Sequence, residues 1–245
     1  MRKVCFIAAA STLFLAAPAE AAQQPFEIDS FSTSAGEVKV TFLGHGTLMF
    51  FHKGQVFHVD PFSEVADYET LPKADAVLIT HEHFDHLDRS ALDAIVTPNT
   101  EILLNEASEK ILGRGRVLKN GERTELLGVK VEAVPAYNIL HEREKGQPFH
   151  PRGEHNGYIL TFGDTRFYVA GDTENTPEMK ALKDIDVAFL PMNLPYTMTP
   201  EMVADAARAF RPKVLYPYHY GETDPALLKD LLKDSGIDVR IRKMQ

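Results

Sequence analysis

The chain has 245 residues, 44% of them hydrophobic and 25% charged, which suffices for one globular domain with a sizeable core. Its formal net charge of −9 argues against a nucleic-acid partner, because surfaces that bind nucleic acid are usually basic. Its single cysteine excludes an internal disulfide framework.

The first residues predict a cleaved secretory signal peptide. Arg2 and Lys3 precede the apolar run 4–17, which is short for a membrane span, and Ala19-Glu20-Ala21 supplies the small residues of a cleavage site. We expect a signal peptide over residues 1–21, a mature domain over 22–245, and a periplasmic or secreted protein with no stable membrane anchor after cleavage. Removal of Cys5 leaves no thiolate nucleophile, so a bound metal must use His, Asp, Glu or Asn.

An irregular lead-in is expected over residues 22–37, and beyond it apolar runs alternate with helical patterns. The expected strands are bounded by Gly, Pro or Asp: residues 37–43, 47–52, 55–60, 76–80, 129–134, 157–162, 166–171, 187–192 and 213–218. Helices are expected over residues 89–97, 106–112, 177–184, 200–210 and 225–235, with Thr176 and Thr199 as N-caps. Early hairpins followed by alternating strands and helices predict an α+β fold of two mixed sheets packed together, with helices outside.

One stretch, Thr80-His-Glu-His-Phe-Asp-His-Leu-Asp88, carries three histidines and three acids directly after an apolar strand pattern. In extended backbone His81 and His83 point the same way, so they can share one metal ion. Asp85 and His86 are adjacent and, where the chain turns, can bind a second ion. A solvated His-rich loop is the alternative, but this spacing of ligand residues favours a metal site.

The same stretch resembles the signature of the metallo-β-lactamase superfamily. Supporting motifs follow the superfamily's order across nearly the whole mature chain: LGHGTLMF and HVDPF before it, VAGDT and YPYHYG after it. Their details are most similar to the branch that includes ascorbate-6-phosphate lactonase and N-acyl-phosphatidylethanolamine phospholipase D. The resemblance implies a four-layer αββα sandwich with a metal site at one edge, between the sheets.

The resemblance also implies roles for single residues. His81 and His83 match the pair on the first metal, and Asp85 and His86 match ligands of the second. Asp172 matches the carboxylate that bridges both metals, and His219 matches the last ligand of the second site. Asp60 is expected to orient a ligand histidine rather than to bind metal.

The sequence departs from the superfamily pattern at the third histidine of the first site, which is expected where Asn138 stands. An amide oxygen is a poor zinc ligand compared with imidazole. His150 is the preferred substitute, with His141, His155 and Asn138 itself as alternatives. His45 and, less strongly, Tyr196 are candidates to line the pocket, and residues 142–144 are interpreted as a solvated charge run.

These residues predict a metal-dependent hydrolase that uses a metal-bound hydroxide on a small ester, lactone, amide or phosphodiester. Asp85 is the expected catalytic group, because it can orient the hydroxide and carry a proton to the leaving group. The expected cofactor is one or two divalent ions, Zn²⁺ first and Mn²⁺ or Fe as alternatives. The partner is a small-molecule substrate, and the oligomeric state stays open. The alternative functions are an iron-dependent oxidoreductase and a metal-binding protein with degenerate catalysis.

Overall fold

The computed structural model describes residues 26–245, so the expected signal peptide over residues 1–21 lies outside the described residues. Two seven-stranded sheets form the framework, and each mixes antiparallel and parallel pairs. Within residues 26–245 no helix is both long enough and apolar enough to span a bilayer.

The strands of the first sheet lie side by side in chain order, and the pairing changes from antiparallel to parallel at β4. The pairing follows from the connections. Tight hairpins join the first four strands, which are therefore antiparallel. Longer segments carry the chain back across the sheet before each later strand, which therefore runs parallel to the one before it. The sheet comprises β1 (Glu27–Thr33), β2 (Gly36–Gly44), β3 (Thr47–His52), β4 (Gln55–Val59), β5 (Ala76–Leu78), β6 (Glu101–Leu104) and β7 (Arg116–Val117).

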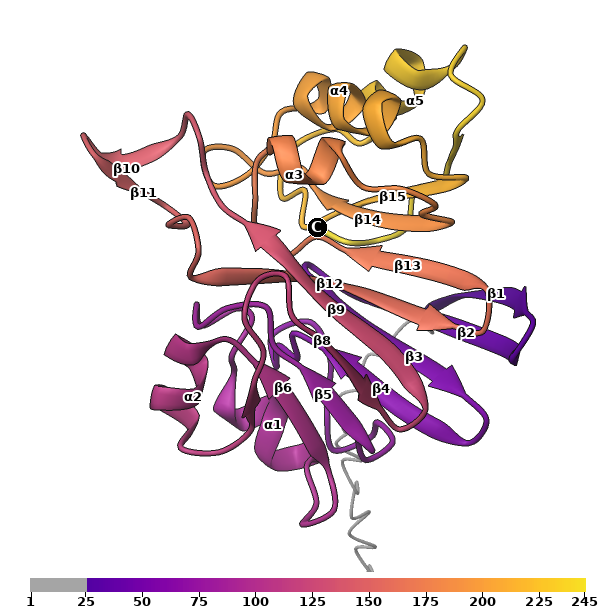
Figure 1. Cartoon of the computed structure of the whole chain (residues 1–245), viewed down its shortest axis with the longest axis vertical. Coiled ribbons are helices and arrows are strands. Elements are labelled where there is room, and N and C mark those ends of the chain that lie inside the picture. The colour runs from indigo at the N-terminus through magenta and orange to yellow at the C-terminus, as the bar shows by residue number, and fades with distance from the viewer. Residues whose placement is uncertain (1–25) are drawn as a thin grey trace, which may run out of the picture.

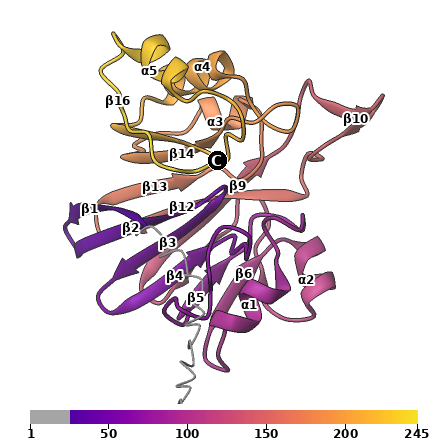
Figure 2. The ribbon, with the colours of Figure 1, turned by 180° about the vertical axis from the view of Figure 1, so that it is seen from behind.

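The second sheet has the order β16-β15-β14-β13-β12-β9-β8, antiparallel from β8 to β13 and parallel from β13 onward. It comprises β8 (Arg123–Leu126), β9 (Val129–Ala136), β12 (His155–Phe162), β13 (Thr165–Val169), β14 (Val187–Pro191), β15 (Val214–Tyr218) and β16 (Asp238–Val239). A separate two-stranded ribbon, β10 (Glu142–Glu144) and β11 (Gln147–Pro148), projects away from both sheets in both views (Figures 1 and 2).

The sheets pack face to face through a core rich in aromatic side chains. Phe50 of the first sheet meets Phe162 and Phe167 of the second, with ring centroids 6.1 and 5.7 Å apart, and all three are buried. A second apolar cluster packs the helix α1 against the outer face of the first sheet. Burial of these apolar surfaces is the main stabilising term for such layers.

Helices cover the outer faces and complete the αββα sandwich (Figure 1). They are α1 (Arg89–Ile95), α2 (Glu106–Leu112), α3 (Pro177–Lys180), α4 (Pro200–Phe210) and α5 (Ala226–Leu232). The predicted N-caps are confirmed: Thr176 and Thr199 accept hydrogen bonds from the third residue of α3 and α4. Asp88 caps α1 in the same way.

The expected irregular lead-in over residues 22–37 is wrong from Glu27 onward, where β1 begins. Its side chains alternate between half-buried and exposed, and most of them are polar, so the sequence lacks the apolar pattern of a strand. β1 pairs with β2 at the sheet edge, where only one neighbour is needed. The helix expected over residues 177–184 is also shorter, since α3 ends at Lys180.

Candidate metal centre

Predicted ligands from distant parts of the chain meet at one edge of the sandwich. His81, His83, Asp85 and His86 follow β5, Asp172 follows β13, and His219 follows β15. The carboxyl ends of these strands lie at the same edge, so their following loops converge there. The structure therefore brings together every residue that the sequence predicted for the second site.

The ligand atoms predicted for the second site are spaced as tetrahedral coordination of one ion requires. The Nε2 atom of His219 lies 3.4 Å from Asp85 Oδ2 and 3.6 Å from Asp172 Oδ2. The Nε2 atom of His86 lies 3.5 Å from Asp172 Oδ1 and 3.7 Å from Asp85 Oδ2. Ligand atoms on one zinc ion at tetrahedral angles are about 3.4 Å apart, given bonds of about 2.0–2.1 Å.

The residues predicted for the first site also bring their ligand atoms close together. The Nε2 atom of His81 and the Nδ1 atom of His83 are 3.0 Å apart, and His150 Nε2 lies 3.4 Å from Asp172 Oδ2. The ring of His150 lies 5.1 Å from that of His81 and 5.0 Å from that of His83. His150 therefore lies where the sequence analysis placed the third histidine of this group.

Several polar atoms that face this space have no hydrogen-bond partner in the described part of the chain. They are buried, and they are His86 Nε2, His150 Nε2, His219 Nε2 and Asp172 Oδ1. A buried polar atom without a partner is costly, so native proteins satisfy nearly all of them. These lone pairs and the carboxylates fit divalent cations, and the assignment of individual ligands stays a prediction.

Hydrogen bonds behind the histidines fix which ring nitrogen faces the site. Asp60 accepts from the Nδ1–H of His86 at 2.8 Å, which leaves His86 Nε2 free. Asp60 also accepts from Thr80 Oγ1 at 2.6 Å, so Thr80 can accept in turn from His81 Nδ1 at 2.9 Å. The contact predicted between Asp60 and a ligand histidine is confirmed, and the arrangement is typical of the outer shell of metal sites.

Asn138 and His141 do not face the cluster with their ligand atoms. The amide oxygen of Asn138 accepts from the backbone N–H of His150 at 2.8 Å and from its Nδ1–H at 2.7 Å. His141 turns instead to Glu174, with Nδ1 2.7 Å from Oε1. Asn138 thus orients His150. The ligand atoms of Asn138 and His141 are both engaged by other residues of the protein.

His155 lies at the back of the first group. Its ring stacks on that of His81 with centroids 4.9 Å apart, and its Nε2–H donates to Glu82 Oε1 at 3.3 Å. Glu82 is held by Asn105, and although burial raises its pKa, the bonds from His155 and Asn105 lower it to about 2. His155 packs against His81, and its ligand atom lies within 4.8 Å of those of His81 and His150, so it stays the alternative to His150, the histidine that approaches Asp172.

The carboxylates dominate the charge of the site. Burial lowers the pKa of His86, but Asp172, Asp60 and Asp85 outweigh it and raise that pKa to about 10. The pKa values of Asp85 and Asp172 are held far below their ordinary range, because the neighbouring histidines outweigh the cost of burial. Burial lowers the pKa of His83 to about 4, with neighbouring histidines adding to the shift. Such a field attracts cations.

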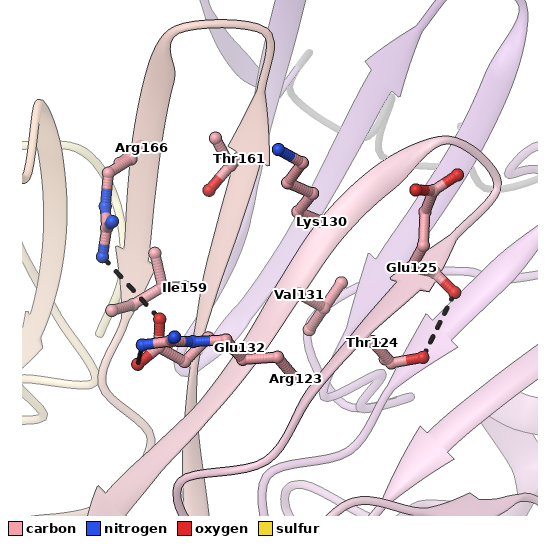
Figure 3. A pocket seen from close by; sticks show the side chains of 9 residues that line it. All are labelled: Arg123, Thr124, Glu125, Lys130, Val131, Glu132, Ile159, Thr161 and Arg166. Atoms are coloured by element: carbon pink, nitrogen blue, oxygen red, sulfur yellow. Dashed lines mark hydrogen bonds and ion pairs between the residues drawn. The ribbon is translucent and has the colours of Figure 1, made fainter.

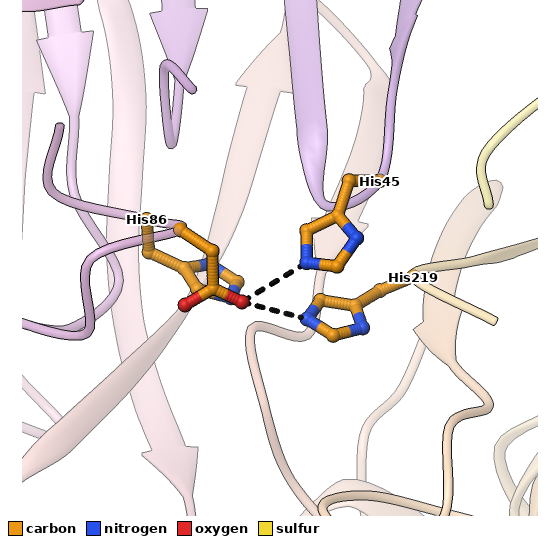
Figure 4. A group of neighbouring side chains, drawn as sticks. His45, His86 and His219 are labelled. Carbon is orange, nitrogen blue, oxygen red and sulfur yellow. Dashed lines mark hydrogen bonds and ion pairs between the residues drawn. The ribbon is translucent and has the colours of Figure 1, made fainter. Parts of the chain in front are cut away.

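His45 completes the wall beside the second group. Its Nε2 atom lies 2.9 Å from Asp85 Oδ2, and its ring lies 3.7 Å from the ring of His219 (Figure 4). The backbone of His45 is left-handed, with φ of 50°. The next residue must be small, because a Cβ on Gly46 would lie 3.0 Å from the His86 ring.

A cavity of about 400 Å³ opens over the cluster. Its remaining lining comes from three loops: Phe84, Arg143, Phe149, Asn193 and Tyr196. The sequence pointed to His45 and Tyr196 but missed the other four, because nothing in their local pattern indicates which loops meet here. Residues 142–144 are all exposed, as a solvated charge run implies, and Arg143 among them also borders the cavity.

A larger hollow of about 560 Å³ lies elsewhere, on the outer face of β8, β9, β12 and β13 (Figure 3). Its charged side chains neutralise one another: Glu132 lies 3.0 Å from Arg123 and 3.9 Å from Arg166. The described residues form no histidine cluster there. Its chemistry is that of a solvated sheet face, so the cavity over the metal centre is the candidate site.

Comparison with known proteins agrees with this geometry. Residues 39–219 match the family described as beta-lactamase superfamily domain. UPF0173 metal-dependent hydrolases of Methanopyrus kandleri and Pyrobaculum arsenaticum are 29% and 31% identical, over 83% and 79% of this chain and 95% and 88% of theirs.

A solved structure gives a similar answer. A crystal structure from Parabacteroides distasonis, described as a metal-dependent hydrolase, is 58% identical with a TM-score of 0.86 and covers 90% of this chain and 100% of its own. The chain therefore belongs to the metallo-β-lactamase superfamily, and within it to the UPF0173 metal-dependent hydrolases.

Proposed function

We propose that this metal-dependent hydrolase cleaves a small ester, lactone, amide or phosphodiester with the help of one or two zinc ions. The observation that carries the proposal is the set of buried, unpartnered nitrogens of His86, His150 and His219 beneath a cavity of about 400 Å³. A cavity of this size holds a small molecule rather than a polymer. Imidazole and carboxylate donors in tetrahedral spacing favour zinc, with manganese and iron as alternatives.

Divalent ions, when bound, would lower the pKa of water and stabilise the negative charge that develops on oxygen in the reaction. The residues of this chain supply orientation. Asp85, which accepts a hydrogen bond from His45, is the acceptor best placed to take and return a proton at the cavity floor. Phe84 and Tyr196 are 73% and 45% exposed and can cover the apolar part of a substrate.

The finer resemblance, to the branch with ascorbate-6-phosphate lactonase and N-acyl-phosphatidylethanolamine phospholipase D, stays part of this proposal. We place the activity in the periplasm or outside the cell, because the N-terminal sequence predicts a signal peptide. A small molecule is the proposed partner, with no nucleic acid and no membrane anchor after cleavage.

The test combines metal analysis with turnover. Purified protein should contain one or two zinc ions per chain and should hydrolyse p-nitrophenyl acetate or bis-p-nitrophenyl phosphate. Asp172→Ala and His86→Ala should lose most of the metal and the activity, whereas His141→Ala should keep both. Bound iron with no hydrolysis would favour the oxidoreductase, and bound zinc with no hydrolysis of either class would favour degenerate catalysis.

A further inference from the structure

The ribbon β10–β11 presents one arginine to the cavity. Glu142 pairs with Pro148 and Glu144 pairs with Gln147, so Arg143 lies at a bulge of the ribbon between its two acidic neighbours. The cavity lining includes Arg143 and neither glutamate. A ribbon that projects from the sheets thus delivers a positive charge to the pocket of an acidic protein (Figure 1).

The guanidinium group of Arg143 is not engaged by a carboxylate. Within residues 26–245 it forms no ion pair and no hydrogen bond, and its recorded contact is with the Phe149 ring, 5.4 Å from the centroid. Arg152 of the same loop is different, because it lies over Tyr137 and also pairs with Glu178 at 2.6 Å. A free guanidinium retains its planar set of donors for an external anion.

The position of Arg143 is set by aromatic packing. Phe149 packs edge-on against Tyr196 with ring centroids 5.0 Å apart, and both rings line the cavity. A cation over an aromatic face is attracted by the ring quadrupole, which restricts where the guanidinium moves. Arg143 therefore lies over the aromatic part of the wall, whereas the histidines and carboxylates form the metal-binding part.

We propose that Arg143 makes this pocket selective for substrates that carry a second anionic group, a carboxylate or a phosphate, away from the bond that is cleaved. The inference rests on the proposed function, because it takes the reacting group to lie at the metal centre. A substrate held there presents its far end to Arg143 and its apolar portion to Phe149 and Tyr196. The substrate class is thus an anionic small ester, lactone or amide.

The experiment measures binding instead of turnover. Metal-loaded protein is titrated calorimetrically with matched acids of equal chain length: succinate against butyrate, glutarate against valerate, and adipate against caproate. One carboxylate in each pair can occupy the metal centre, so the ratio of dissociation constants isolates the far group. A parallel titration with 4-phosphonobutyrate distinguishes a phosphate-type group from a carboxylate.

In at least one pair the diacid should bind roughly 5- to 30-fold more tightly, as expected for a charge-assisted bond that is partly exposed to solvent. Arg143→Gln should reduce this ratio to near one, and Arg143→Lys should keep part of it. Arg152→Gln is the matched control and should keep the full ratio. A wild-type protein without any preference, or a preference that survives in Arg143→Gln, would overturn the proposal.

The outcome is separable from that of the proposed function. A protein that binds diacids through Arg143 but hydrolyses neither probe ester nor mono-p-nitrophenyl glutarate, which carries the far carboxylate, contradicts the hydrolase proposal and leaves the anion site supported. A protein that hydrolyses esters with no diacid preference contradicts the anion site alone.

Discussion

At the scale of single residues, three of the predicted ligand histidines are each held by a partner that is not a predicted ligand. Asp60 orients His86, Thr80 orients His81, and Asn138 orients His150. These partners fix the tautomer and the direction of each ring before an ion binds. The departure at Asn138 therefore has a physical account: the amide supports the histidine that takes the missing position.

The role of His150 can be tested against a neighbour in the same loop. His150→Ala should lower metal affinity at the first site roughly 10- to 100-fold, because it removes a nitrogen aimed at Asp172. His141→Ala should leave affinity unchanged, since that ring bonds to Glu174. Metal titration with a chromophoric chelator measures both. Equal affinities for the two variants and the wild type would refute the assignment.

Metal affinity should increase with pH. In the metal-free protein the carboxylates raise the pKa of His86 to about 10, so this histidine holds a proton at neutral pH that an ion must displace. The pKa of His83, lowered to about 4 by burial and neighbouring histidines, leaves that ring neutral and ready to bind. Between pH 6 and 9 we expect an increase of up to about tenfold per pH unit for one released proton.

Chelator competition across this range provides the measurement, and calorimetry in buffers of different ionisation enthalpy counts the protons. His86→Gln should flatten the dependence as it weakens binding. An affinity that is independent of pH in the wild type would contradict the predicted proton displacement.

At the scale of elements, β1, one of the strands that the sequence analysis did not predict, has a clear tertiary function. Asp29 of β1 accepts two hydrogen bonds from Arg242 Nη2, both 2.7 Å long, and one from the hydroxyl of Tyr216. These contacts connect the first strand of one sheet to β15 and to the C-terminal segment. The strand is thus stabilised by a partly buried ion pair as well as by its pairing with β2.

Replacing Asp29 by Asn should destabilise the fold by roughly 1–3 kcal/mol, the cost of breaking a charge-assisted bond that is partly buried. Burial raises the pKa of Asp29, but Arg242, Tyr216 and Arg240 outweigh it and lower that pKa below its ordinary value of 3.8. A depressed folded pKa contributes stability above about pH 4 that is lost as the pH falls. The difference between wild type and Asp29→Asn should therefore shrink at low pH.

Urea unfolding at pH 7 and at pH 3 measures this difference. Asp164→Asn is a suitable control, because Asp164 is an exposed carboxylate at the β12–β13 turn and bonds to the backbone of Ser34. If the difference in free energy of unfolding between wild type and Asp29→Asn grows as the pH is lowered, the role of the Asp29–Arg242 pair is contradicted.

At the scale of the whole molecule, the loops that follow strands of both sheets meet at the candidate metal centre. The mature domain predicted over residues 22–245 includes all of these elements, which begin at Glu27.

We predict that the exported protein begins near residue 22. The cause is the charged start, the apolar run and the Ala19-Glu20-Ala21 site. N-terminal sequencing of protein from the periplasm or the medium gives the result directly, and Ala21→Tyr should block cleavage. Soluble cytoplasmic protein that still begins at Met1 would refute the prediction.

The sequence by itself determined most of the helices and strands and the four candidate ligands that lie in the loop after β5. Strands with strong apolar patterns, such as β3, β12 and β14, and capped helices, such as α2 and α4, lie within a residue or two of their predicted bounds, because local periodicity and capping encode them. His81, His83, Asp85 and His86 were found for the same reason, since their spacing within one loop is itself the signal.

Asp172 and His219 were found only through the resemblance of their motifs. Tertiary structure alone decided the rest: that β1 is a strand, that Asn138 supports His150, and that Arg143 faces the cavity. Each of these depends on how a segment packs against its neighbours in the folded chain, which no local pattern records. The packing of two sheets supplies those contacts by bringing the loops to one edge.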